Sequence, residues 1–224
     1  MSNPKIIKEI SLWYVLAVAA LVLSNTIGLF SGFLGRNSGI IPALFFLLAP
    51  WFVLQRKGIK PRTYGLHGER PVHSIVAALL AAIIVFPPYF VGFGLWAGFI
   101  DNATADWSKL PTIGWWLWLF ITHFLAIALP EEVFFRGYIQ GRLALLFKRR
   151  IKIFGVSCGP ELVLASALFA LIHLVSIPAP FRLAVFFPGL LFGWLKERTG
   201  SVLAPALLHA ASNVVLAALN QVYY

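Results

Sequence analysis

Two adjacent carboxylates and an arginine, Glu131, Glu132 and Arg136, lie within an otherwise apolar stretch of the chain. An ionisable side chain at bilayer depth costs several kcal/mol, so such residues mark functional sites. Two later apolar segments each carry a histidine, His173 and His209. Carboxylates and histidines in such segments predict either the movement of protons or ions, or acid–base chemistry.

The spacing of the three charges assigns them different tasks. On a regular helix at about 100° per residue, Glu132, Arg136 and Gln140 form one polar stripe. Glu132 and Arg136 have the favourable acid-before-base order for an i, i+4 ion pair, which would keep Glu132 ionised and structural. Glu131 points about 140° away from Arg136 on the same wheel, which makes it the candidate reactive carboxylate. The alternative is that all three charges only lock helices together.

The segment His209-Ala210-Ala211-Ser212-Asn213 places two polar groups at i, i+4. His209 and Asn213 therefore project from one helix face and can converge on a carbonyl oxygen, as an oxyanion hole requires. The alternative is a packing face of small residues in which the polar groups only hold helices together.

Together these side chains supply the roles needed for amide hydrolysis by water. Glu131 and His173 would activate the water molecule. His209 and Asn213 would hold the developing oxyanion. A single histidine in a membrane segment can also be only an interhelical hydrogen-bonding group, and this alternative applies to His173.

No side-chain nucleophile competes with this interpretation. Ser212 lacks the Gly-x-Ser-x-Gly context, and Cys158 has no histidine beside it in the sequence. We therefore expect no cofactor. Zinc is the alternative, with Glu131, His173 and His209 as ligands, although the chain has no His-Glu-x-x-His motif.

The composition is that of an integral membrane protein. Of 224 residues, 60% are hydrophobic and only 12% are charged, whereas soluble domains average about 25% charged residues. The net charge of +10 comes from short loops between apolar runs, so it does not indicate nucleic-acid binding. Trp115, Trp116 and Trp118 cluster as at a membrane interface.

We expect an all-α polytopic membrane helix bundle of about seven to eight transmembrane helices. Residues 1–224 would form a single integral membrane domain, with the motifs in a core of about 115–216. The apolar runs give seven predicted spans, at about 10–33, 40–54, 74–100, 115–135, 160–177, 183–195 and 201–220.

The basic residues orient these spans. Thirteen lysines and arginines fall in loops on one side and three, Arg36, Lys109 and Arg182, on the other. The positive-inside rule then places the N-terminus in the cytoplasm. We expect the first span to be retained, because its apolar core is longer than that of a signal peptide.

The predicted spans leave one difficulty. Glu131 would lie near the cytoplasmic end of its helix, whereas His173 would lie about 20 Å into its own span. Their cooperation would need a broken or tilted helix. The prolines able to break a helix are Pro87, Pro88, Pro130 and Pro188.

At these residues the chain resembles the CPBP family of intramembrane proteases, also called the CAAX-protease and bacteriocin-processing or Abi family. The resemblance covers about 115–216. Its three motifs occur in the family's order, as Glu131-Glu132-x-x-x-Arg136, Phe169-x-x-x-His173 and His209-x-x-x-Asn213.

The resemblance implies an intramembrane endopeptidase of the glutamic type, with a metalloprotease as the alternative. In such a family the first glutamate and first histidine activate water, and the second histidine and the asparagine form the oxyanion hole. It also implies a membrane-associated protein or peptide substrate, from which a C-terminal tail or sorting signal is removed. We expect the protein in a bacterial inner membrane.

Two rival functions use the same residues. In a proton- or ion-coupled transporter the buried charges would form a relay, but the Glu-Glu pair has no counterpart in the other half of the chain. In a non-catalytic membrane scaffold they would serve packing alone.

Overall fold

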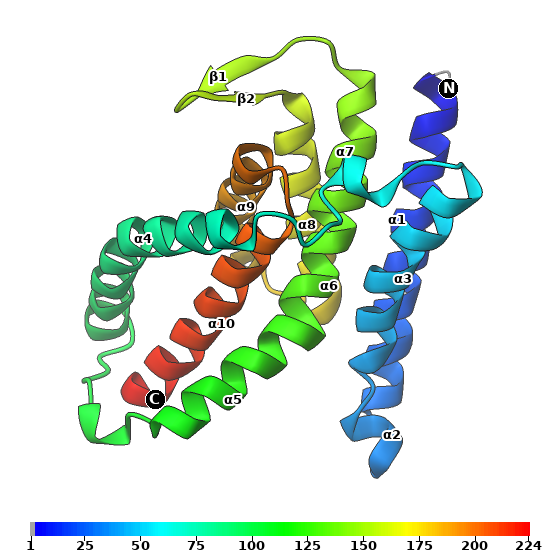
Figure 1. The fold of residues 1–224 in the computed structure, drawn as a ribbon. Coiled ribbons are helices and arrows are strands. Elements are labelled where there is room, and N and C mark those ends of the chain that lie inside the picture. The colour runs from blue at the N-terminus through cyan, green and yellow to red at the C-terminus, as the bar shows by residue number, and fades with distance from the viewer. Residues whose placement is uncertain (1–2) are drawn as a thin grey trace.

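The computed structural model describes residues 3–224, and it is almost entirely helical (Figure 1). Prolines begin several helices, including α4 at Pro71 and α8 at Pro160, where the missing N–H costs nothing. The helices are α1 (Asn3–Gly28), α2 (Phe33–Arg36), α3 (Ile40–Arg56), α4 (Pro71–Phe99), α5 (Ile113–His123), α6 (Leu129–Glu132), α7 (Gln140–Leu143), α8 (Pro160–Ser176), α9 (Phe186–Thr199) and α10 (Leu203–Tyr223). Short 3-10 segments are Pro61–Tyr64, Trp107–Lys109, Ala144–Leu146 and Pro180–Val185.

One β-hairpin departs from the all-α prediction. Strands β1 (Ile151–Ile153) and β2 (Val156–Cys158) pair antiparallel, with Ile151 opposite Cys158. The turn residues Phe154 and Gly155 both have positive φ, 49° and 79°, as a tight two-residue hairpin turn requires. The strands are too short to be predicted from an alternation of polar and apolar residues.

Within residues 3–224, four helical stretches are long and apolar enough to cross a membrane: Asn3–Gly28, Pro71–Phe99, Ile113–Leu146 and Leu203–Tyr223. Ile40–Arg56 and Pro160–Ser176 are shorter apolar helices. The predicted span at 183–195 falls on a 3-10 segment followed by α9, which has 14 residues. Length and composition thus support an integral membrane helix bundle with four clear spans.

The span predicted at about 115–135 is the first part of a longer helix, and the polar stripe through Gln140 lies on its continuation. Helices α5, α6 and α7 join through two π-helical segments, Phe124–Ala128 and Val133–Ile139, into one stretch of 34 residues, Ile113–Leu146. Glu131 therefore lies near the middle of a long helix rather than at its cytoplasmic end. The helix continues past the charges because its buried polar side chains find partners on neighbouring helices.

Different elements and chain termini lie at the two ends of the bundle. The N-terminus and the hairpin lie at one end, and α2 and the C-terminus lie at the other (Figure 1). Helix α4 changes direction part-way along (Figure 1), and Pro87 and Pro88 lie inside it, consistent with a proline kink.

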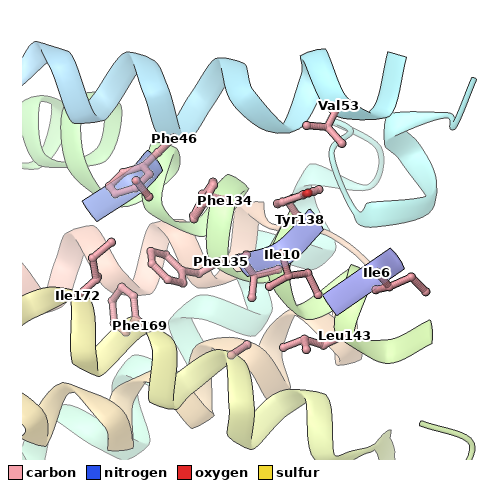
Figure 2. Packing of buried hydrophobic residues seen from close by; sticks show 13 residues of the cluster. Ile6, Ile10, Phe46, Val53, Phe134, Phe135, Tyr138, Leu143, Phe169 and Ile172 are labelled. Atoms are coloured by element: carbon pink, nitrogen blue, oxygen red, sulfur yellow. The ribbon is translucent and has the colours of Figure 1, made fainter. Parts of the chain in front are cut away.

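The π-helical segment Val133–Ile139 forms the centre of the core. All seven of its residues are buried. Phe134 packs on Phe46 of α3 with ring centroids 5.1 Å apart, and Phe135 packs on Phe169 of α8 at 5.2 Å (Figure 2). Aromatic contacts on both sides thus fix the long helix Ile113–Leu146, called the motif helix from here on, between α3 and α8.

A charged cluster ties α1 to this helix. The carboxylate of Glu9 accepts hydrogen bonds from Arg142 at 2.8 Å and from the Tyr138 hydroxyl at 3.0 Å. Lys57, just after α3, lies 3.0 Å from the same carboxylate. Helices α1 and α3 are therefore held to the motif helix by charge as well as by apolar packing.

Helix α9 contacts the motif helix through glycines. The amide nitrogen of Gln140 donates to the carbonyl of Gly193 at 3.2 Å and to Glu197 at 2.9 Å. A Cβ at position 193 would lie 2.7 Å from Gln140 Oε1. The close approach of the two helices thus depends on the absence of a side chain at Gly193.

We predict that Gly193→Ala lowers the melting temperature in detergent, because overpacking a tight contact costs about 1–3 kcal/mol. Gly92→Ala on α4 is the matched control, since a Cβ there meets nothing within 4 Å. Thermal unfolding of both variants beside the wild type is the measurement. Equal melting temperatures for Gly193→Ala and the wild type would contradict the packing described here.

Candidate active site

The motif side chains come from three helices. Glu131 and Glu132 lie on α6, His173 on α8, and His209 and Asn213 on α10. Helix α6 is a short α-helical piece between the two π-helical segments. Such π segments occur often at functional sites. Regular α-helical geometry therefore does not describe the helix beyond Glu132. The i, i+4 contact predicted from that geometry, between Glu132 and Arg136, is nevertheless present.

One carboxylate oxygen of Glu132 is shared by two partners, while within residues 3–224 the other, Oε2, is buried without a hydrogen bond. Its Oε1 atom accepts from Arg136 Nη1 at 3.1 Å and from His209 Nδ1 at 3.0 Å. The side chains of Glu132 and Arg136 are both 0% exposed. The predicted Glu132–Arg136 ion pair is thus confirmed, and His209 is added to it, a contact that the sequence did not reveal.

Arg136 is surrounded on every side. Its Nη2 atom donates to the Gly189 carbonyl at 3.1 Å. Its guanidinium carbon lies 4.0 Å from the centre of the Phe169 ring and 5.4 Å from that of Phe192, within cation–π range. The arginine therefore joins the motif helix to α8 and α9 as well as neutralising Glu132.

The orientation of His209 is set by its neighbours. Its ring stacks on Phe192 at 5.0 Å with an interplanar angle of 19° and meets Phe169 edge-on at 5.9 Å. Since Nδ1 is bonded to Glu132, the other nitrogen faces Glu131, with Nε2 3.8 Å from Glu131 Oε2. His209 thus lies between the two carboxylates.

Glu131 differs from its neighbour. Its side chain is 19% exposed, against 0% for Glu132. Within residues 3–224 the Oε2 atoms of both glutamates are buried without a hydrogen-bond partner, so the two differ in exposure and in the bonds that Glu132 makes through Oε1. Helix geometry predicted that Glu131 is turned away from Arg136, and the structure likewise has no bond between the two side chains.

His173 on α8 lies near Glu131 and His209. Its Nδ1 lies 2.7 Å from the Phe169 carbonyl, which can only accept a hydrogen bond, so Nδ1 carries the proton. In the neutral ring Nε2 then has a free lone pair. His173 is within electrostatic range of both Glu131 and His209. Glu131 and His173 therefore lie close enough to interact, although the predicted spans placed them at different depths.

Asn213 is half-buried, one helical turn beyond His209. Across the described part of the chain its side chain has no hydrogen-bond partner. Its predicted convergence with His209 on an oxyanion stays a prediction.

The sequence interpretation missed other residues around the site. His123 lies two turns before Glu131 on the same long helix and interacts electrostatically with His209. Its Nδ1 is buried without a partner among the described residues. Its place within an apolar run was the only available signal. Gly189 and Phe192 gave no signal, because their importance arises from contacts between helices.

The alternative zinc ligands do not gather into a metal centre. Within residues 3–224 no three or more His, Cys, Asp or Glu side chains are arranged to hold a metal ion. Glu131, His173 and His209 therefore do not form a three-ligand site in this conformation.

Residues 113–215 match the protein-family model described as "Type II CAAX prenyl endopeptidase Rce1-like". That stretch contains all three motifs and the site described above. Comparisons with curated proteins and with solved structures found no match.

The protein is thus an integral membrane protein made mostly of helices. Over residues 113–215 it carries a domain of the Rce1-like type II CAAX prenyl endopeptidase family, which confirms the resemblance seen in the motifs. Membership of this family implies an intramembrane endopeptidase.

We predict that Arg136→Ala and Glu132→Ala each lower the yield of folded protein and its melting temperature. Either change leaves a buried charge without its partner, at a cost of about 3–5 kcal/mol. Arg36→Ala is the control, because Arg36 is exposed on α2. If both buried variants melt at the wild-type temperature in detergent, the pair does not stabilise the fold.

Proposed function

We propose that this protein hydrolyses a peptide bond of a membrane-associated protein or peptide. Glu131 and His173 activate the water molecule, and His209 and Asn213 stabilise the oxyanion. The observation that carries the proposal is the contrast between the two glutamates. Glu132 is 0% exposed and its Oε1 atom is bonded to Arg136 and His209, whereas Glu131 is 19% exposed and lies 3.8 Å from His209 without an arginine partner. Among residues 3–224 the Oε2 atoms of both glutamates are buried without a hydrogen-bond partner, so exposure and the bonds of Glu132 Oε1 make the difference.

In the proposed reaction a water molecule lies between Glu131 and His173. Its oxygen attacks the carbonyl carbon as Glu131 accepts its proton, and the carbonyl oxygen becomes an oxyanion. His209 keeps protons on both ring nitrogens throughout the cycle, one directed to Glu132 and one to the oxyanion, so it neither gains nor loses a proton. The proton taken by Glu131 passes to the leaving nitrogen as the C–N bond breaks. No covalent intermediate forms with the protein.

The substrate class follows from the family and the location of the site. The site lies within a helix bundle with four candidate membrane spans. The substrate is therefore a protein or peptide held at the membrane, from which a C-terminal tail or sorting signal is removed. The lipid bilayer is the other partner.

The orientation is also part of the proposal. The N-terminus and the hairpin, with its neighbouring basic residues Lys148, Arg149 and Arg150, lie at the same end of the bundle (Figure 1). The positive-inside rule places this end in the cytoplasm of a bacterial inner membrane. The seven predicted segments then cross alternately, with α3, α8 and α9 as the shorter crossings.

We predict that Glu131→Gln abolishes hydrolysis while the protein still folds. Glutamine keeps the shape of the side chain but cannot accept a proton, a role worth about 10²–10⁴-fold in rate. Cleavage of a co-expressed membrane substrate is the readout, with Glu69→Gln in a surface loop as the control. Near-wild-type cleavage by a folded Glu131→Gln protein would remove Glu131 from the mechanism.

We predict that hydrolysis persists in a chelator such as EDTA. The proposed site supplies water activation and an oxyanion hole from protein groups alone. Turnover is compared before and after dialysis against the chelator. Loss of turnover that stoichiometric zinc restores would show that Glu131, His173 and His209 act as zinc ligands instead.

We predict that Asn213→Ala lowers kcat by about 10²–10³-fold, as the loss of an oxyanion donor does. KM changes little, because the charge exists mainly in the transition state. Asn220→Ala, exposed near the end of the same helix, is the matched control. The melting temperature is taken on the same sample, and a destabilised protein with normal kcat would assign Asn213 to packing.

A further inference from the structure

An apolar groove lies away from Glu131 and Glu132, at the end of the bundle that carries the hairpin. It is a groove of about 860 Å³ between α4, α8 and α9, closed at one end by the hairpin. Figure 1 shows the hairpin beyond the end of α9, with the first half of α4 beside α9. The groove is lined by Ala77, Leu80, Ala81, Ile84, Val85, Ile153, Phe154, Leu162, Val163, Leu190, Leu191, Trp194, Leu195 and Arg198.

The lining changes in character along α9. Leu191, Trp194 and Arg198 line the groove and follow one another at steps of three and four residues, so they lie on one helix face. From Leu191 to Arg198 the rise is about 10 Å. Along the groove an aliphatic side chain is followed by an indole and then by a cation. These groups match, in order, the acyl chain, the interfacial region and the phosphate of a lipid.

The hairpin forms a fixed end wall. The indole nitrogen of Trp194 donates to the carbonyl of Ile153 at 2.9 Å, so the hairpin is bonded to α9. Phe154 at the turn lines the groove yet is 89% exposed. An exposed phenylalanine beside an indole and basic residues fits a position at the boundary between acyl chains and headgroups.

Arg198 is available to an anion. Its guanidinium carbon lies 5.7 Å from the centre of the Trp194 ring. The adjacent carboxylate, Glu197, is engaged instead by Arg150 at 3.2 Å and by Lys196 at 3.0 Å. Among residues 3–224, Arg198 has no carboxylate partner of its own.

We propose that this groove is a binding site for an anionic membrane phospholipid. One acyl chain lies along Leu191 and Ala81, and the phosphate is held by Arg198 at the rim. Arginine binds phosphate oxygens in a bidentate manner. An extended peptide fits less well, because its backbone N–H and C=O groups would meet a lining that is almost entirely apolar. The proposal does not depend on the protease activity.

The test is native mass spectrometry of the full-length protein with phosphatidylglycerol and phosphatidylcholine of identical acyl chains. The wild type should retain phosphatidylglycerol about tenfold more strongly, as one charge-assisted contact allows. Arg198→Gln should reduce that preference to near unity. Arg36→Gln, which removes an exposed charge at the other end of the bundle, should keep it.

A second pair of variants tests the groove itself. Ala77→Phe narrows it from α4 and should reduce retention of both lipids, whereas Ala126→Phe, on an exposed face of the long helix, should not. Equal retention of the two lipids by the wild type would overturn the proposal. An equal loss of phosphatidylglycerol in Arg198→Gln and Arg36→Gln would also overturn it, since net charge alone would then explain binding.

Discussion

The arrangement of this membrane protein depends on one carboxylate oxygen. Glu132 Oε1 is shared between Arg136 and His209 in a position with no exposure to solvent. A charge buried in apolar surroundings must be paired and hydrogen-bonded, so neither partner can move away cheaply. Because Arg136 also reaches the Gly189 carbonyl, this one oxygen helps to hold the motif helix, α9 and α10 together.

The same constraint separates two chemically identical neighbours. Glu132 is bonded to Arg136 and to Nδ1 of His209 and has no exposure, whereas Glu131 lies 3.8 Å from Nε2 of His209 and is 19% exposed. Phe169 and Phe192 enclose the histidine and the arginine and limit the orientations of both. The structural pair therefore positions the residues that we propose to be reactive.

Sequence reasoning reached the membrane character, the motifs and the Glu132–Arg136 pair, because each depends on composition or on residues close together in the chain. It ended the predicted span at about residue 135, whereas π-helical segments and partners on other helices let the helix continue through its own charges to Leu146. The Glu9 cluster and the bond from His209 to Glu132 join residues far apart in the chain. No local pattern contains such contacts. The hairpin was not predicted because its strands have three residues each.

The central claim of the proposed mechanism is that a water molecule activated by Glu131 hydrolyses a peptide bond of a substrate held at the membrane. The most direct measurement incubates the purified protein in lipid nanodiscs with a membrane extract in ¹⁸O-enriched water, which labels every newly formed C-terminus. Peptide mass spectrometry then identifies the labelled products and, through them, the substrate. We expect labelled C-termini from the wild type and none above background from an equally folded Glu131→Gln protein. No labelled termini from the wild type, or the same termini from both proteins, would contradict the mechanism.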